Sequence, residues 1–321
     1  MVWEAVAVAL YRSCISTISP SFTWFNTAFW VLAESRVFQS KVSMDQMMEG
    51  IPTHDLMLEL VAPPGGRITT GFIPITFLTA RSRQQVPYTT VPYFEKEAHE
   101  NAMHMAQFST EELTRLLRIN NKLAAENVLR YHDFLSPDAP SLPALLAYTG
   151  IVFKRLNPKD FTEEDWKYAQ QHLFITSFLY GLLRPLDLIK NYRLEGDVRM
   201  PEHGDITMFE YWRPLLTEYF ITEIKKQGNL LINLASAEMK DLFHWKEVTR
   251  AVEVVTPEFM VYKNGKPTTV VIYAKMCRGE MTRFILKNRI EDIESLKSFE
   301  WEGFTFDEAL SQDNRLIFTL K

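Results

Sequence analysis

The stretch His172–Arg199, HLFITSFLYGLLRPLDLIKNYRLEGDVR, joins two apolar segments through a glycine and ends in a basic run. Gly181 stands at the expected turn. Four cations follow the turn: Arg184, Lys190, Arg193 and Arg199. A glycine turn can expose backbone N–H groups, and a helix N-terminus carries partial positive charge, so this arrangement suits a phosphate. The alternative is a buried helical hairpin with solvated charges.

A second basic segment, AKMCRGEMTRFILKNRI, spans Ala274–Ile290. A helix is expected to begin near Gly279, so Lys275 and Arg278 would lie where a strand gives way to a helix. Sites collect at strand ends in mixed α/β folds, which makes this pair a candidate for anion binding. Lys287 is expected on the solvated outer face of the helix.

The composition limits the classes of function. The chain has 321 residues, of which 46% are hydrophobic, and this is typical of a globular protein. Because the net charge is −5, contact with nucleic acid must come from a local basic patch. Cys14 and Cys277 are the only cysteines, which excludes a disulfide framework and fits a reducing cytoplasm. The setting of Cys277 between two cations predicts a lowered thiol pKa.

Cofactor and metal signatures are missing from the sequence. The seven histidines show no HExxH or HxxxH spacing, and GxGxxG, GxxxxGK[ST] and GxSxG are absent. We therefore expect no metal site, no nucleotide cofactor and no catalytic triad. Two apolar patches, Val6–Leu10 and Phe22–Leu32, are too short to span a membrane, so no membrane partner is expected.

The chain changes character near residue 72. Residues 1–71 have poor periodicity and no clear helix caps. They are expected to be an extension outside the functional fold, arising from an upstream start or a frame error. Residues 72–321 are expected to form the functional domain.

From residue 72 on, helix caps, periodicity and turn signals predict the elements of this domain. The expected helices are Tyr93–Gln107, Ser109–Arg118, Lys122–Phe134, Thr162 to about Phe178, and Met208–Gln227. The expected strands are Ile73–Thr79, Leu230–Leu234, Glu253–Tyr262, Thr268–Ala274 and parts of Phe304–Thr319. Asn264-Gly265 is a strong hairpin signal between two of the strands. The order of the elements predicts an α+β fold with a mixed sheet and surrounding helices.

Five blocks in a fixed order carry a resemblance to a known family. They are ALLAYTGIVFKRL (144–156), DWKYAQQHLFITSFLYGLLRPLDLIKNYRLEGDVR (165–199), LINLASAEM (231–239), YAKMCRGEMTRFILKNRI (273–290) and FEWEGFTFDE (299–308). Over residues 72–321 the chain resembles the YaaA family (UPF0246) of bacterial peroxide-stress proteins. The resemblance implies a cytoplasmic protein that binds DNA, limits damage from hydrogen peroxide and lowers unincorporated iron. It also implies a helix-hairpin-helix element beside a basic cleft.

The resemblance also implies a set of phosphate-binding residues for double-stranded or partly unpaired DNA. They are Gly181, Arg184, Arg193, Lys275, Arg278 and Arg81. Gly181 would form the turn that lets a phosphate approach, and the arginines could contact phosphate oxygens bidentately. Arg81 stands in the tetrad Thr79-Ala80-Arg81-Ser82, where the family has an Ala-Lys-Thr turn, so the charge is kept but not a deprotonatable amine.

Two other functions remain open from the sequence. The same cleft could belong to an enzyme that acts on a phosphorylated or nucleotide-like small molecule. Such an enzyme would hold its anionic ligand with Lys275, Arg278 and Arg184, and Glu238 would serve as a base. Direct handling of iron is the third possibility, and no ligand cluster supports it. The leading hypothesis is a DNA-binding protein that is not an enzyme. For that function we expect neither a catalytic residue nor a cofactor.

Overall fold

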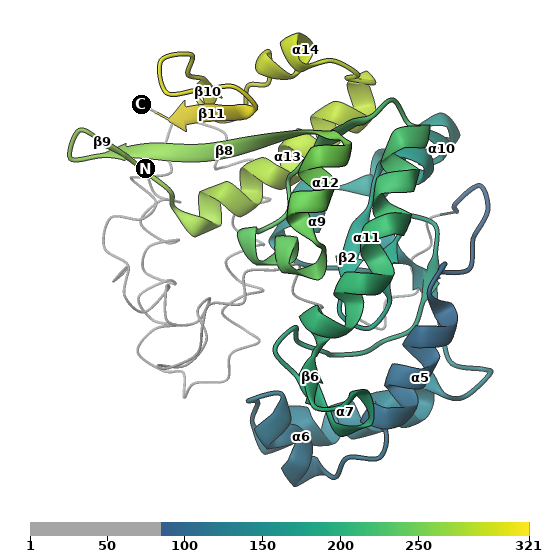
Figure 1. Ribbon diagram of the computed structural model, residues 1–321. Helices are drawn as coiled ribbons and strands as arrows, with labels where there is room; N and C mark the ends of the chain where they lie inside the picture. Colours follow the sequence, from purple (N-terminus) through teal and green to yellow (C-terminus); the bar gives the residue numbers. More distant parts are fainter. Residues whose placement is uncertain (1–84, 321) are drawn as a thin grey trace, which may run out of the picture. The chain divides into compact units, whose positions relative to one another are not determined.

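The structure, a computed structural model, describes residues 85–320 (Figure 1). The chain divides into two compact units between Ile68 and Thr69, and all described residues belong to the second unit. The expected extension 1–71, the expected strand Ile73–Thr79 and Arg81 lie outside the described residues. No helix in the described part is long and apolar enough to cross a membrane.

The described part begins with the helices α5 (Glu95–Met105), α6 (Thr110–Leu116) and α7 (Asn121–Phe134), and side-chain caps start the last two of them. The Ser109 hydroxyl accepts a hydrogen bond from the Glu112 N–H, and the Glu112 carboxylate accepts one from the Ser109 N–H. This reciprocal pair is the capping box that the sequence predicts. All three predicted helices are confirmed, although α6 ends before Arg118.

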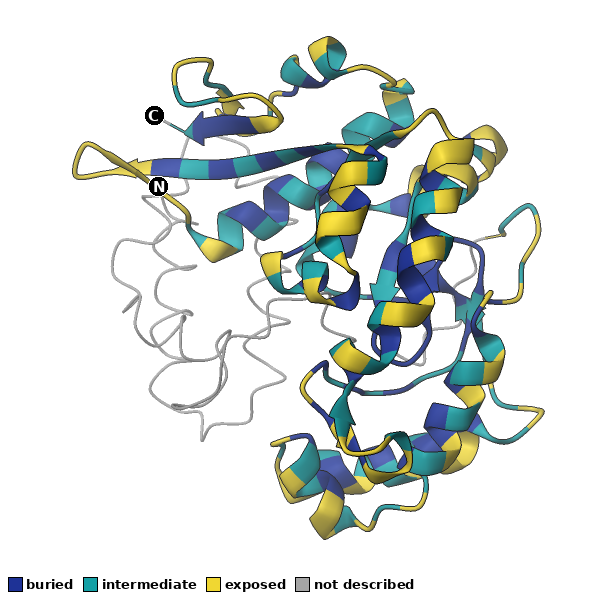
Figure 2. Ribbon diagram, in the orientation of Figure 1, coloured by how far each residue is buried: buried dark blue, intermediate teal, exposed yellow. Residues whose placement is uncertain are grey.

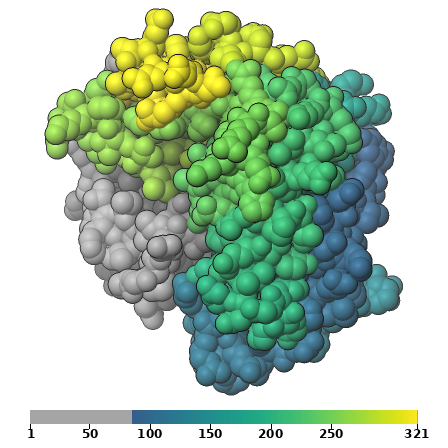
Figure 3. All heavy atoms as spheres, in the orientation of Figure 1, coloured from purple at the N-terminus to yellow at the C-terminus, as the bar shows by residue number. Residues whose placement is uncertain are grey.

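The other helices are α8 (Ala144–Ala147), α9 (Ile151–Leu156), α10 (Glu163–His172), α11 (Met208–Lys226), α12 (Trp245–Ala251), α13 (Val271–Asn288) and α14 (Ile293–Lys297). Three short 3-10 helices are η2 (Pro158–Asp160), η3 (Pro201–His203) and η4 (Ala237–Leu242). A capping box at Thr162 and Asp165 starts α10, as expected. Phe94, the N-cap residue of α5, packs edge-on against Trp212 of α11 at 5.6 Å between ring centroids. Figure 3 shows the green surface of the middle of the chain lying directly against the blue surface of its first described helices.

The main sheet is mixed, as the sequence predicts. Its strands are β7 (Leu230–Ile232), β8 (Glu253–Lys263), β9 (Lys266–Thr268), β10 (Thr305–Phe306) and β11 (Arg315–Leu320). The order is β10-β11-β8-β7, in which β11 and β7 run parallel to β8 and β10 runs antiparallel to β11. β9 returns antiparallel along β8 through Asn264-Gly265, and both turn residues have positive φ (50° and 73°). This is the geometry that an Asn-Gly hairpin turn requires.

The core has two parts. The larger part is formed mainly by the helices and includes Trp166 and Trp212, whereas the smaller part lies between the sheet and α13. Figure 2 shows buried and partly exposed residues alternating along β8, and α13 packs against this strand (Figure 1). The buried residues of β8 include Val255, Phe259 and Val261, which line the smaller core. Period-2 alternation is expected for a strand whose two faces have different environments.

The predicted helical hairpin around Gly181 is wrong. α10 ends at His172, and β2 (Ile175–Ser177) then pairs antiparallel with β3 (Gly181–Leu183). Gly181 has a φ of +70°, and a Cβ there would lie 2.7 Å from the Trp212 ring. β-branched residues and packing against a distant tryptophan therefore favour a β-hairpin over a helix. No helix-hairpin-helix forms in this stretch.

Four other short strands also pair antiparallel in the described part. They are β1 (Leu142–Pro143) with β4 (Leu188–Ile189), and β5 (Arg199–Met200) with β6 (Ile206–Thr207). Thr90 forms a bridge to Asp187 next to β4. These pairs and β2–β3 hold residues 173–207 in place without an α-helix.

The predicted strand Thr268–Ala274 is also wrong. β9 ends at Thr268, and α13 begins at Val271, eight residues before the expected start at Gly279. The β-branched residues here favour a strand, but packing of α13 against the sheet and α9 outweighs that preference. Lys275 and Arg278 consequently lie within a helix rather than at a strand–helix junction.

Candidate anion-binding site

Polar side chains follow the carboxyl end of β7. The Asn233 N–H donates to the Val255 carbonyl (2.8 Å), which extends the parallel pairing by one residue. Asn233 and Ser236 are buried, and the Ser236 hydroxyl donates to the Glu238 carboxylate at 3.4 Å. Ser236 precedes η4, but its side chain does not cap that helix. Hydrogen-bonding groups therefore gather where a parallel strand ends, as they often do at ligand sites in α/β folds.

Lys275 and Arg278 lie one turn apart on α13, so they share one side of the helix. Both side chains are partly buried. The Arg278 Nε is fully buried without a hydrogen-bond partner. Among the described residues, neither cation has an ion pair or hydrogen bond to its charged head. The other described candidates, Arg184 and Arg193, each form an ion pair with a carboxylate.

The electrostatics of this pair favour a bound anion. Burial lowers the pKa of Lys275, and the nearby Arg278 lowers it further, whereas Glu238 raises it. Burial also lowers the pKa of Arg278, against the opposing effect of Glu258. Two like charges withdrawn from water are unfavourable, and an anion between them would offset both the repulsion and the lost hydration.

Arg184 already has partners. Its guanidinium donates to the Glu223 carboxylate (3.0 Å) and to the Gln171 carbonyl (2.9 Å). It also lies over the Phe174 ring, 3.6 Å from the centroid. A guanidinium that is neutralised and stacked in this way is not available as an anion clamp, so the structure does not support this predicted role.

The cavity beside Arg184 is not a basic cleft. It has a volume of about 380 Å³, and its charged lining residues are Arg184, Asp187 and Glu223. Burial raises the pKa of Asp187, while hydrogen bonds from the Arg184 N–H and the Thr90 hydroxyl lower it. Because two carboxyl groups face one guanidinium, the cavity does not attract anions. Lys275 and Arg278 do not border it.

The remaining predicted residues do not join the pair on α13. Gly181 is buried under Trp212, so its backbone cannot receive a phosphate. Arg193 forms an ion pair with Glu195 at 2.9 Å. Arg81 lies outside the described residues. The structure therefore brings together Lys275 and Arg278, and it gives Arg184 and Arg193 carboxylates of their own.

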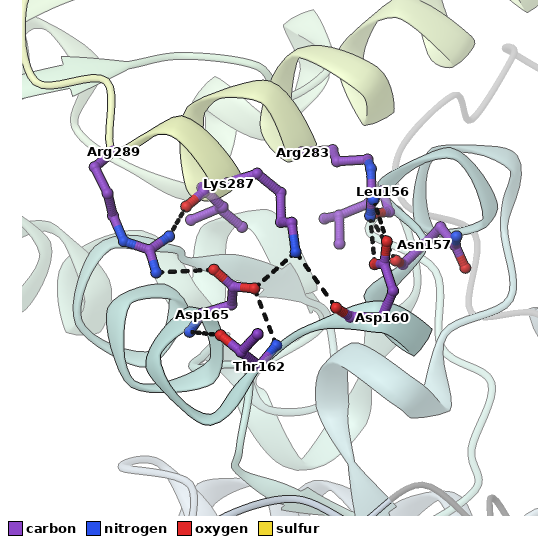
Figure 4. Close-up of polar contacts among 9 residues, drawn as sticks. Leu156, Asn157, Asp160, Thr162, Asp165, Arg283, Lys287 and Arg289 are labelled. Atoms are coloured by element: carbon purple, nitrogen blue, oxygen red, sulfur yellow. Dashed lines mark hydrogen bonds and ion pairs between the residues drawn. The ribbon is translucent and has the colours of Figure 1, made fainter.

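The end of α13 is occupied by a structural ion cluster (Figure 4). Asp165, only 4% exposed, accepts hydrogen bonds from Lys287 and Arg289, both at 2.8 Å. Arg283 pairs with Asp160 and also donates to the carbonyls of Leu156 and Asn157. The prediction that Lys287 is a solvated surface residue is therefore wrong. These cations attach α13 to α10 and η2.

Cys277 is not the reactive thiol that the sequence suggests. Its side chain is fully buried in the smaller core, next to the sheet. Burial raises the pKa of the thiol strongly, and the Glu280 carboxylate raises it further. Cys277 and Phe259 belong to the same smaller core, so burial there outweighs the effect of the neighbouring Arg278 on the thiol pKa. A low-pKa thiolate cannot form there.

Metal ligands do not cluster in the part of the chain that the structure describes. No group of three His, Cys, Asp or Glu side chains within residues 85–320 is placed to hold a metal ion.

Comparisons with known proteins all indicate one family. The family described as "Peroxide stress protein YaaA" matches residues 74–310, which include β7 and α13. A UPF0246 protein of Phocaeicola vulgatus is 63% identical over 243 residues, which cover 76% of this chain and 95% of the relative. A UPF0246 protein of Bacteroides thetaiotaomicron is 62% identical over 241 residues (75% and 94%). One from Porphyromonas gingivalis is 46% identical over 234 residues (73% and 91%).

Proposed function

Because the chain belongs to the peroxide stress protein YaaA family, we propose that it protects the cytoplasm from hydrogen peroxide by binding an anion at Lys275 and Arg278. One observation supports this proposal: two partly buried cations lie one turn apart, and neither head group forms an ion pair or hydrogen bond with a described residue, although Glu238 acts electrostatically on Lys275 and Glu258 on Arg278. An ion pair with a ligand would satisfy both cations.

A small phosphorylated or nucleotide-like molecule fits this site best. The fork of Arg278 can bind two oxygens of one phosphate, and Lys275 can add a point charge. Asn233 and Ser236 are buried beyond the end of β7, and the Ser236 hydroxyl donates to Glu238, the carboxylate that acts on Lys275, so these side chains offer further hydrogen bonds. Glu238 lies close enough to raise the pKa of Lys275, so it could act as a base if the ligand is also transformed.

DNA is the second candidate ligand. Lys275 and Arg278 each keep part of their surface exposed, so a backbone phosphate could reach them. The hairpin would not contribute to this binding, because Gly181 is buried and Arg184 is paired with Glu223. Protection of DNA would limit iron-dependent oxidative damage without requiring the chain to bind iron.

The proposal predicts that Lys275→Ala and Arg278→Ala abolish protection against hydrogen peroxide. Cells that lack their own copy would receive the wild-type chain or a variant, and survival after a peroxide pulse would be counted. Lys225→Ala is the matched control, because Lys225 is an exposed lysine on α11. Both site variants should survive no better than cells without the protein, and the control should match wild type. Full protection by both site variants, at equal protein levels, would refute the proposed role of the pair.

A further inference from the structure

Asp187 is a buried carboxylate without a cation of its own. The residue is only 4% exposed, and its carboxylate accepts hydrogen bonds from the Thr90 hydroxyl (2.6 Å) and the Arg184 main-chain N–H (2.7 Å). No Lys, Arg or His side chain of residues 85–320 forms an ion pair with it. An ionised carboxylate can accept about four hydrogen bonds, so half of this capacity is unused.

The nearby Arg184 guanidinium does not neutralise Asp187, because it is bound elsewhere. It donates to the Glu223 carboxylate and to the Gln171 carbonyl. Glu223 also pairs with Lys226, so this carboxylate has two cations whereas Asp187 has none. Burial raises the pKa of Asp187, and the charge of Arg184 opposes this effect less than the two hydrogen bonds do. A buried carboxylate of this kind is unfavourable unless a cation approaches it.

A cavity of about 380 Å³ gives access to Asp187 between β3 and α11. This volume is in the range of small-molecule sites. The opposite walls are apolar and aromatic, and they include Leu182 and Tyr219. The Tyr219 ring stacks on that of Tyr93 at 4.1 Å, and Tyr93 is 67% exposed. Burial and the charges of Glu223 and Asp187 raise the pKa of Tyr219, so the carboxylates and the aromatic wall are within reach of one small ligand.

We propose that this cavity binds a small organic cation, a primary ammonium group on an apolar body. The ammonium donates to the unused acceptor positions of Asp187, and the body lies against Leu182 and Tyr219. A quaternary ammonium fits less well, because it has no N–H to donate. The site is independent of the proposed anion binding, since Lys275 and Arg278 do not border the cavity.

Three ligands of similar shape test the proposal on the full wild-type chain. Calorimetric titration would compare 2-phenylethylamine, a cation at neutral pH, with the neutral 2-phenylethanol and the anionic 3-phenylpropionate. The amine should bind at least about tenfold more tightly than the alcohol, as a hydrogen bond between charged groups requires. The acid should bind more weakly than the alcohol. Equal affinity for amine and alcohol, or no binding of the amine at millimolar concentration, would overturn the proposal.

Asp187→Asn removes the charge and should reduce the affinity for the amine to that for the alcohol. Asp138→Asn is the matched control, because Asp138 is an exposed aspartate in the loop after α7, and it should bind as wild type does. Undiminished amine binding in a folded Asp187→Asn would refute the assignment.

NMR of the Asp187 carboxyl carbon in wild type gives a second test that does not depend on folding of the variant. The bound amine should lower the pKa of Asp187, because an adjacent cation favours the charged form. A pKa that the amine leaves unchanged would overturn the proposal. Asp187→Asn should leave the binding of pyrophosphate unaltered, so this site and the proposed function stand or fall separately.

Discussion

Replacing Asp165 with alanine is expected to lower the free energy of unfolding by about 3–5 kcal/mol, the range for breaking a buried ion pair. The Asp165 carboxylate is 4% exposed and accepts hydrogen bonds from Lys287, Arg289 and the Thr162 N–H. Its removal leaves two partly buried cations without their anion and takes away half of the capping box of α10. Urea unfolding of both proteins would measure the loss.

The pH dependence gives an independent test of the same cluster. Burial by itself would raise the pKa of Asp165, but hydrogen bonds from Lys287, Thr162 and Arg289 outweigh it and hold the pKa well below its usual value. A lowered pKa in the folded state adds stability above the unfolded pKa of about 3.9, and this stability is lost as the pH falls further. Asp165→Asn should therefore lose less stability than wild type between about pH 5 and pH 2. Identical acid sensitivity of both proteins would contradict the assignment.

Gly279→Ala is expected to destabilise the protein by about 3 kcal/mol, the upper end for overpacking a close contact. Gly279 lies where α13 crosses α9. A Cβ there would overlap the Val152 carbonyl oxygen and lie 2.7 Å from the Arg155 Cβ. Backbone atoms of α9 cannot move aside as a flexible side chain could.

Whether Gly279→Ala destabilises or stabilises the protein distinguishes overpacking from helix propensity. Helix propensity alone predicts that Gly279→Ala stabilises α13 by about 1 kcal/mol. A measured gain in thermal or urea stability would therefore show that the two helices do not touch at this point. Gly204→Ala is a suitable control, because no atom lies within 4 Å of a Cβ there and only its positive φ (76°) opposes the change. It should cost about 1 kcal/mol.

Elements with local signals were predictable from the sequence. The capping boxes at Ser109 and Thr162 and the Asn264-Gly265 turn depend on groups within three or four residues of one another. Such contacts form with little help from the rest of the fold, so the residue pattern identifies them.

The β-hairpin at residues 175–183 and the start of α13 were not predictable in this way. The conformation of Gly181 depends on Trp212, which lies 31 positions further along the chain. The helical conformation of Val271–Tyr273 depends on packing against the sheet and α9. Both are tertiary effects that override local preference.

The candidate site was predictable only in part. Lys275 and Arg278 attract attention as a basic pair, and they do lie together on α13, although their role stays a prediction. The partner of Arg193, Glu195, is two residues away and could have been recognised in the sequence. Glu223, which neutralises Arg184, is 39 residues away and has no such signal. A charge count alone cannot separate paired cations from free ones.

Calorimetric titration of the full chain with pyrophosphate tests the anion site most directly, with duplex DNA as the competing ligand. The wild-type chain should bind pyrophosphate, and Lys275→Ala and Arg278→Ala should each weaken binding about tenfold or more, as loss of a charged hydrogen bond requires. Lys225→Ala should bind as wild type does. For a small ligand, affinity should change little between about 50 and about 200 mM salt, whereas duplex DNA held by several phosphates would lose affinity steeply. Unchanged pyrophosphate affinity in both site variants would contradict the account.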